Sequence, residues 1–187
     1  MKVIAAKLAV AIEKLHSMKI VHCDVKPANT IYNKETERLT LVDFGLSIQL
    51  DSMDLELSIK NGTPRYMAEE ALNREKYNYT VDWYSYGATL LIMFGGEIDV
   101  FTETQNGIKR DIKIYSYKNL DESQKLLVQR CLEPKETRVR KLIDIKGHVY
   151  FEELKWDQND IEFRRNTSKP KSRKEQITNN LLCCYRK

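Results

Sequence analysis

Two carboxylates, a lysine and an asparagine lie close enough along the chain to do chemistry together. The polar loop at residues 21–29 contains Asp24, Lys26 and Asn29, and Asp43 opens the tripeptide Asp43-Phe44-Gly45. Oxygen ligands of this kind suit Mg²⁺, which prefers one or two carboxylates plus substrate phosphates to a closed protein cage. A carboxylate off the metal can accept a hydroxyl proton, and a nearby lysine can neutralise a transferring phosphoryl group. The pattern therefore predicts a phosphoryl-transfer site.

A β-hairpin is predicted to bring these two segments together. Apolar, β-prone runs at residues 30–32 and 39–42 are joined by the polar residues 33–38, which indicates two antiparallel strands. The polar loop enters this hairpin and Asp43 leaves it. Both segments therefore reach the same end of the two strands.

Helices are predicted to form most of the remaining structure. Apolar residues at helical spacing predict an amphipathic helix that ends near Ser17, although the charged and apolar start of the chain also imitates a signal peptide. A buried helix is predicted at 80–94 and an amphipathic one at 120–132, while 47–67 reads as a long loop that is regulatory or faces a substrate. The expected fold class is mainly α with a small β-hairpin.

Composition narrows the function classes. The chain has 187 residues and a mean hydropathy of −0.54, and it contains no apolar run near the roughly 20 residues of a membrane-spanning helix. Its four cysteines fit neither a disulfide framework nor a zinc site, so we expect a reducing, intracellular and cytoplasmic location.

Charge divides the chain into a near-neutral body and a basic end. Residues 164–187 hold eight basic side chains and one acidic one, which leaves 23 basic and 26 acidic residues in the first 163 positions. We therefore expect a folded domain at 1–156, a basic and flexible tail at 157–187, and no nucleic-acid binding by the fold.

Five motifs, in order along the chain, carry a family resemblance. They are His22-Cys23-Asp24 with Asn29, Asp43-Phe44-Gly45, the segment Gly62 to Glu70, the segment Asp82 to Gly87, and Arg138 after Cys131-Leu132 and Pro134. In this order the sequence resembles the protein kinase family from about residue 3 to residue 156. The match concerns the C-terminal lobe of the kinase fold, and details of residues 62–68, 79–83 and 147–156 resemble the branch of the cyclic-nucleotide-dependent and G-protein-coupled-receptor kinases.

The resemblance implies a role for each matching residue. Asp24 takes or orients the proton of the substrate hydroxyl, and Lys26 stabilises the transferring group. Asn29 and Asp43 hold Mg²⁺, with Mn²⁺ as an alternative, on the phosphates of ATP. Ile31 lines the floor of the adenine pocket, and Val42 lines its inner wall. Structural roles are implied for His22, Phe44, Gly45, Glu70, Asp82 and Arg138, with Arg138 pairing with Glu70.

The resemblance also implies partners and modifications. Lys26-Pro27 is the form found in serine/threonine kinases, so the expected partner is a protein substrate with Ser or Thr as the acceptor. Thr63 in the loop and Thr167 in the tail are candidate phosphorylation sites, although Thr167 also fits a basic tail that happens to contain a threonine. Cys183-Cys184 with the basic tail suggests acylation and membrane contact, against the alternative of two reduced cysteines.

Departures from the family pattern limit these expectations. Cys23 stands where the family usually has an arginine that binds a phosphorylated loop, and Glu69 replaces a proline. The chain contains neither a Gly-x-Gly-x-x-Gly loop nor a Val-Ala-Ile-Lys-like strand, so we expect the N-terminal lobe to be absent and supplied, if at all, separately. One hypothesis is a kinase lower lobe that transfers phosphate weakly or not at all alone; the other is a non-catalytic docking module.

Overall fold

The computed structural model describes residues 1–105, 108–156, 161–163 and 171–172. Its first element is the helix α1, Lys2–Ser17, which places an alanine- and leucine-rich face in the core and ends at the predicted position. Within the described residues no helix is long and apolar enough to cross a membrane.

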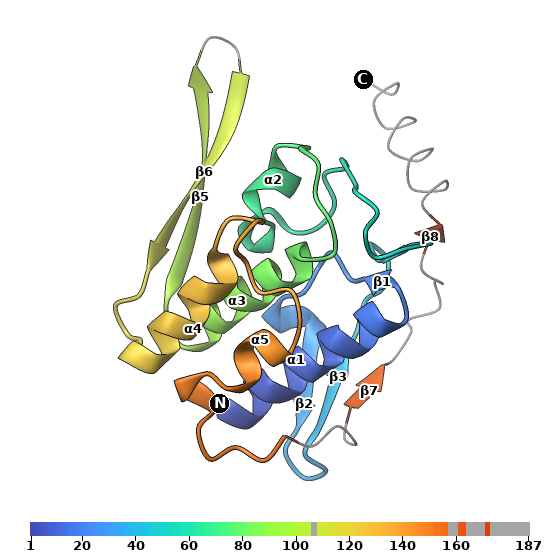
Figure 1. Ribbon diagram of the computed structural model, residues 1–187. Coiled ribbons are helices and arrows are strands. Elements are labelled where there is room, and N and C mark those ends of the chain that lie inside the picture. Colours follow the sequence, from blue (N-terminus) through green and yellow to red (C-terminus); the bar gives the residue numbers. More distant parts are fainter. Residues whose placement is uncertain (106–107, 157–160, 164–170, 173–187) are drawn as a thin grey trace.

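Two further helices pack against each other beside α1 (Figure 1). The helix α3, Val81–Met93, is buried along most of its length, as its apolar sequence predicted, and α4 is Glu122–Leu132. Asp121 begins α4 with a capping box that it shares with Gln124, which satisfies two backbone donors at the helix start. Gly87 of α3 allows the close approach, because a Cβ there would lie 2.5 Å from the Cβ of Cys131.

The predicted hairpin is present as β2, Thr30–Asn33, and β3, Arg38–Leu41, paired antiparallel with Thr30 opposite Leu41. A second small pairing joins β1, Ile20–Val21, to β4, Ile48–Gln49, also antiparallel. These two pairs frame the segments 21–29 and 42–47. The chemistry-bearing residues therefore lie in turns between short, fixed strands.

Two strands from the predicted tail extend these sheets. β7, Ile161–Phe163, pairs in parallel with β3, and β8, Lys171–Ser172, pairs in parallel with β4. The resulting orders are β2-β3-β7 and β1-β4-β8. The rest of the predicted flexible tail lies outside the described residues.

The expectation of a single small hairpin was wrong. Strands β5, Glu97–Gln105, and β6, Ile108–Ser116, form a longer antiparallel hairpin that extends away from the helices (Figure 1). Its base is fixed to the body: Ile98 is buried, the hydroxyls of Tyr115 and Tyr84 contact each other, and Lys113 Nζ donates to the Met67 carbonyl. These contacts at the base hold the hairpin against the body.

Short helices connect these elements around two apolar clusters. They are η1 Pro27–Asn29, η2 Pro64–Tyr66, α2 Glu69–Leu72, α5 Ile143–Lys146 and η3 Val149–Phe151. The larger cluster joins α1, α3 and α4 and contains Trp83, whose indole N–H donates to the Arg140 carbonyl over 3.0 Å. The smaller cluster contains Leu57, Met67 and Tyr77, so the long loop at 47–67 has apolar anchors of its own.

Candidate active site

Asp24 is the centre of a hydrogen-bonded cluster. Lys26 Nζ donates to Asp24 Oδ2 over 2.7 Å, and Asn29 Nδ2 donates to the same oxygen over 3.1 Å. The Thr63 hydroxyl donates to Asp24 Oδ1 over 2.6 Å, while Lys26 Nζ also donates to the Thr63 hydroxyl over 2.8 Å. The structure thus brings together Asp24, Lys26 and Asn29, as the sequence predicted, and adds Thr63.

These contacts determine the protonation state of Asp24, which is only 4% exposed. Burial by itself raises the pKa of the carboxyl group, because it disfavours the charged form. The hydrogen bonds from Lys26, Thr63 and Asn29 outweigh burial, so the pKa of Asp24 lies below its ordinary value. Asp24 is therefore an ionised carboxylate at neutral pH.

Asp82, at the start of α3, holds the backbone that leads into Asp24. Its two carboxylate oxygens accept the N–H groups of His22 and Cys23, each over 2.8 Å, and His16 Nε2 lies 2.9 Å from Oδ2. Cys23 adopts a left-handed conformation with φ 65°, which is costly for a side chain other than glycine. The paired hydrogen bonds to Asp82 compensate for this strain and aim the following residue, Asp24.

Gly62 fits against this strained turn. It has φ 125°, and a Cβ at this position would lie 2.4 Å from the Cys23 carbonyl oxygen. A glycine is therefore required for Thr63 to approach Asp24.

His22 links this turn to the end of β3. Its Nε2 lies 3.1 Å from the Val42 carbonyl, which can only accept, so this nitrogen carries the proton. The Asp24 N–H donates to the other ring nitrogen over 3.3 Å, and the ring lies 5.1 Å from that of Phe44. Burial lowers the pKa of His22, despite nearby Asp82, which acts to raise it. The neutral imidazole thus connects the loop of Asp24 with the segment of Asp43.

Asp43 and Asn29 lie at the same end of the hairpin. The Val42 N–H donates to the Asn29 carbonyl over 3.0 Å, and Asp43 follows directly with φ 63° and an exposed side chain. Among the described residues no group of three or more His, Cys, Asp or Glu gathers as metal ligands. One carboxylate and one amide fit Mg²⁺ bound mostly through water and phosphate oxygens, and they do not fit a closed metal cage.

The two residues expected to line an adenine pocket differ in exposure. Ile31 is 53% exposed and Val42 is half-buried, while nearby Phe44 is buried. Exposure of Ile31 leaves an apolar side chain facing solvent beside the candidate site.

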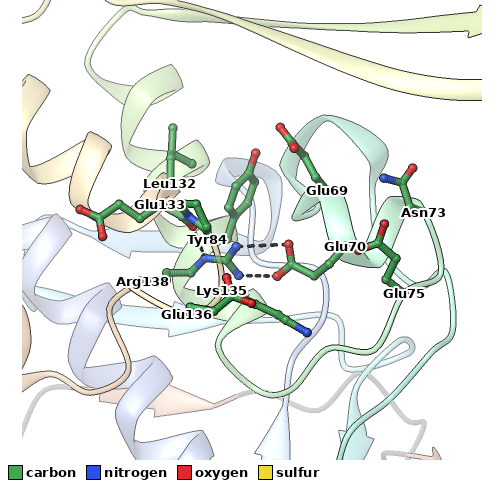
Figure 2. A pocket seen from close by; sticks show the side chains of 11 residues that line it. Glu69, Glu70, Asn73, Glu75, Tyr84, Leu132, Glu133, Lys135, Glu136 and Arg138 are labelled. Carbon is green, nitrogen blue, oxygen red and sulfur yellow. Dashed lines mark hydrogen bonds and ion pairs between the residues drawn. The ribbon is translucent and has the colours of Figure 1, made fainter.

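Arg138 pairs with Glu70 away from this cluster, as the resemblance implied. Its Nη1 and Nη2 donate to the two Glu70 oxygens over 2.6 and 3.2 Å, and the guanidinium lies 4.9 Å from the centre of the Tyr84 ring. The pair borders a pocket of about 330 Å³ between α2 and residues 132–138 (Figure 2). Glu69, the residue that replaces the usual proline, is exposed and lines this pocket beside Glu70.

Comparison with known proteins decides the family. The sequence model of the protein kinase domain matches residues 1–151. The chain belongs to the protein kinase family.

Individual kinases show the same relationship. The serine/threonine-protein kinase Sgk1 of Rattus norvegicus is 31% identical over 159 residues, which cover 82% of this chain and 37% of the rat protein. Sgk1 of Homo sapiens and Sgk1-A of Xenopus laevis are each 30% identical over 162 residues, with the same coverage. These kinases belong to the branch that includes the cyclic-nucleotide-dependent kinases, which confirms the predicted branch. The chain spans 37% of the length of these relatives.

Thr63 and His16 make contacts in this site that the sequence did not predict, and three predicted residues are not described. Thr63, expected as a phosphorylation site, has its hydroxyl on Asp24 and Lys26. Sequence reasoning also missed His16 on Asp82, because 66 residues separate the two and the helical pattern of α1 gave no signal for a polar partner. Thr167, Cys183 and Cys184 lie outside the described residues.

Proposed function

We propose that this chain is a serine/threonine kinase lower lobe that directs the γ-phosphoryl group of ATP to Ser or Thr hydroxyls of a protein substrate. The observation that carries the proposal is the ionised Asp24 carboxylate, held between Lys26, Asn29 and Thr63. An ionised, oriented carboxylate beside a cationic nitrogen is what proton removal from a substrate hydroxyl requires.

Each residue of the cluster has a proposed task. Asp24 accepts the hydroxyl proton. Its position is fixed by the preceding backbone at His22 and Cys23, whose N–H groups donate to Asp82. Lys26 is half-buried, and its Nζ lies between the Asp24 carboxylate and the Thr63 hydroxyl, where it neutralises charge on the transferring group. Thr63 orients the carboxylate through its hydroxyl and its backbone N–H, which donates to Asp24 Oδ1 over 3.0 Å.

Asn29 and Asp43 are the proposed ligands of Mg²⁺. The hydrogen bond between Val42 and Asn29 brings the two to one end of the hairpin, and both offer the oxygen atoms that this ion prefers. A bound Mg²⁺ would supply charge neutralisation on the ATP phosphates. Asn29 is oriented for this by Asp24, whose backbone carbonyl accepts from its Nδ2 over 2.8 Å.

A transfer assay tests the proposal. The chain is incubated with labelled ATP, Mg²⁺ and three peptides that differ only in a Ser, Thr or Tyr acceptor. We expect slow labelling of the Ser and Thr peptides, no labelling of the Tyr peptide, and a loss of at least about 100-fold in Asp24→Asn, the lower range for general base catalysis. Asp54→Asn, which changes an exposed carboxylate outside the cluster, serves as the matched control and should keep the rate.

The outcome separates the two functional hypotheses. Labelling that is equal in the chain and in Asp24→Asn would contradict the proposal. Complete absence of transfer and of Mg²⁺-dependent ATP binding would instead favour the non-catalytic docking module.

A further inference from the structure

The chain covers two of its own sheet edges with strands from beyond residue 160. β7 pairs with β3 through Leu39–Ile161, Thr40–Glu162 and Leu41–Phe163, and β8 pairs with β4 through Ile48–Lys171 and Gln49–Ser172. We call β7 and β8 together the tail strap. The kinase motifs do not predict these strand pairings, and the proposed kinase chemistry does not require them.

The two pairings agree in direction, order and spacing. Both pairings are parallel. β7 pairs with β3, and β8, which comes later in the chain, pairs with β4, so the strap meets the body strands in their own chain order. Seven residues separate β7 from β8, and six separate β3 from β4. The strap therefore matches the spacing of the body strands on both sides of one turn, the segment that contains Asp43-Phe44-Gly45.

The positions of the two body strands show what the strap can restrain. β3 runs directly into Val42, whose carbonyl binds His22 and whose N–H binds Asn29. β4 begins one residue after Ser47, whose hydroxyl donates to the His22 carbonyl over 3.2 Å. Helix α1 contacts β7 as well, so the first strap strand lies against both a helix and a strand of the body.

We propose that the tail strap is a built-in strand clamp, which docks on the β3 and β4 edges and holds the Asp43–Gly45 turn from both sides. An unpaired strand edge offers a row of free N–H and C=O groups to any extended segment. A segment of the same chain has the advantage, because its tether keeps its effective concentration high. Each pairing is short, so the clamp opens and closes without unfolding the helices.

Cysteine cross-linking tests the register directly. Neighbouring strands lie about 4.8 Å apart, which is within the Cα separation that a disulfide bridges. In a chain with Cys183→Ser and Cys184→Ser, the matched pairs Thr40→Cys with Glu162→Cys and Gln49→Cys with Ser172→Cys should cross-link under mild oxidation. The swapped pairs, Thr40→Cys with Ser172→Cys and Gln49→Cys with Glu162→Cys, contain the same substitutions and should cross-link at least about tenfold more slowly, because they are not register neighbours.

Equal cross-linking of matched and swapped pairs would overturn the proposal. Cross-links that form between two molecules, seen as a doubled mass that rises with protein concentration, would overturn its intramolecular form.

Hydrogen exchange on the complete chain provides the second test. Glu162→Pro with Phe163→Pro removes two successive N–H groups, one of which faces β3, since successive N–H groups point to opposite edges. Alanine at the same two positions keeps both N–H groups and is the matched control. We expect about tenfold faster exchange at residues 38–42 in the proline variant only, with α3 unchanged as a check of folding.

Unchanged exchange at residues 38–42 in the proline variant would overturn the clamp. Neither experiment contains nucleotide or measures transfer, so a failure here is distinct from a failure of the proposed kinase function.

Discussion

Asp82 shows how one buried side chain can position a site that it does not belong to. A fully buried carboxylate is costly unless donors surround it, and Asp82 has the N–H groups of His22 and Cys23 together with the ring of His16. These donors come from α1 and from the loop of Asp24. These hydrogen bonds satisfy the buried oxygens of Asp82, and they fix the left-handed turn at Cys23.

His22 makes the stability of the folded chain depend on pH. Burial lowers the pKa of His22 below the usual value of about 6.5, so the folded state binds this proton less readily than the unfolded state. The contribution of neutral His22 to the free energy of unfolding is complete above about pH 6.5, and it is lost as the pH falls through the lowered pKa of His22. Urea unfolding between about pH 5 and pH 7 should show stability rising with pH by up to about 1.4 kcal/mol per unit.

Two histidine variants separate the contributions to this slope. His22→Gln should be less stable at neutral pH and should show a flatter pH dependence, because a glutamine does not titrate. His148→Gln is the comparison. Burial also lowers the pKa of His148, but this side chain is only partly buried, so its loss should change the slope less. If His22→Gln keeps the full slope, the neutral imidazole is not the source of the pH dependence.

The Glu70–Arg138 pair should be costly to break from one side. Arg138→Met leaves the Glu70 carboxylate buried without its partner, and we expect a loss of about 3–5 kcal/mol in the free energy of unfolding. Lys125→Met breaks the exposed pair with Glu122 and should cost less than about 1 kcal/mol. Both values come from chemical denaturation.

A double variant tests the cause of that loss. Glu70→Met with Arg138→Met removes both charges, so it should be more stable than Arg138→Met alone. If the double variant loses as much free energy of unfolding as Glu70→Met and Arg138→Met lose together, an unpaired charge is not the cause.

At the scale of elements, the contact between α3 and α4 depends on a missing side chain. In an exposed helix, Gly→Ala usually stabilises by about 1 kcal/mol. At Gly87 the new Cβ meets Cys131, Leu132 and the Val128 carbonyl, so Gly87→Ala should instead destabilise by about 1–3 kcal/mol. Gly147→Ala is the control because no atom lies within 4 Å of its Cβ position, and thermal unfolding of both variants should show a lower midpoint for Gly87→Ala only.

The β5–β6 hairpin shows where local sequence patterns stop being informative at this scale. Polar and apolar residues alternate over only four positions in each strand, 97–100 and 111–114, and most of the remaining strand residues are polar or charged. The hairpin is fixed instead by contacts at its base, Tyr115 with Tyr84 and Lys113 with the Met67 carbonyl, across at least 31 residues of chain. No window of neighbouring residues contains that information.

At the scale of the whole molecule, prediction succeeded where the physical cause was local. The helical spacing of apolar residues before Ser17, the apolar run at 80–94 and the β-prone runs at 30–32 and 39–42 predicted elements close to those observed. The motif residues Asp24, Lys26 and Asn29 lie within a few positions of one another, so their meeting was predictable. The hydrogen bond of Thr63 to Asp24 and the pairing of β7 with β3 join distant segments, and only the folded chain reveals them.

Nucleotide binding is a property of the whole chain, and we expect it to be weak. The proposed contacts to Mg²⁺ and the phosphates come from Lys26, Asn29 and Asp43, while Ile31 is open to solvent and the sequence contains no glycine-rich phosphate loop. Because ligand stabilisation grows with the ratio of ligand concentration to Kd, Mg²⁺ and ATP should raise the thermal midpoint by no more than about 2 °C. The shift should disappear without Mg²⁺ and in Asp43→Asn, with Asp54→Asn as control.

A thermal shift well above about 2 °C would contradict this expectation and show that the chain forms a complete nucleotide site. A shift in Asp43→Asn equal to that of the unchanged chain would show that Asp43 is not a metal ligand.

The two tryptophans give this molecule a built-in optical readout. Trp83 is fully buried on α3, whereas Trp156 is partly exposed, lies against Phe151 with ring centres 4.8 Å apart, and stands close before the tail strap. Indole emission moves to longer wavelength when water reaches the ring. In Trp156→Phe, emission therefore reports on the helical core around Trp83, and in Trp83→Phe it reports on the surroundings of Trp156, so loosening of these two regions can be followed separately by the wavelength of emission.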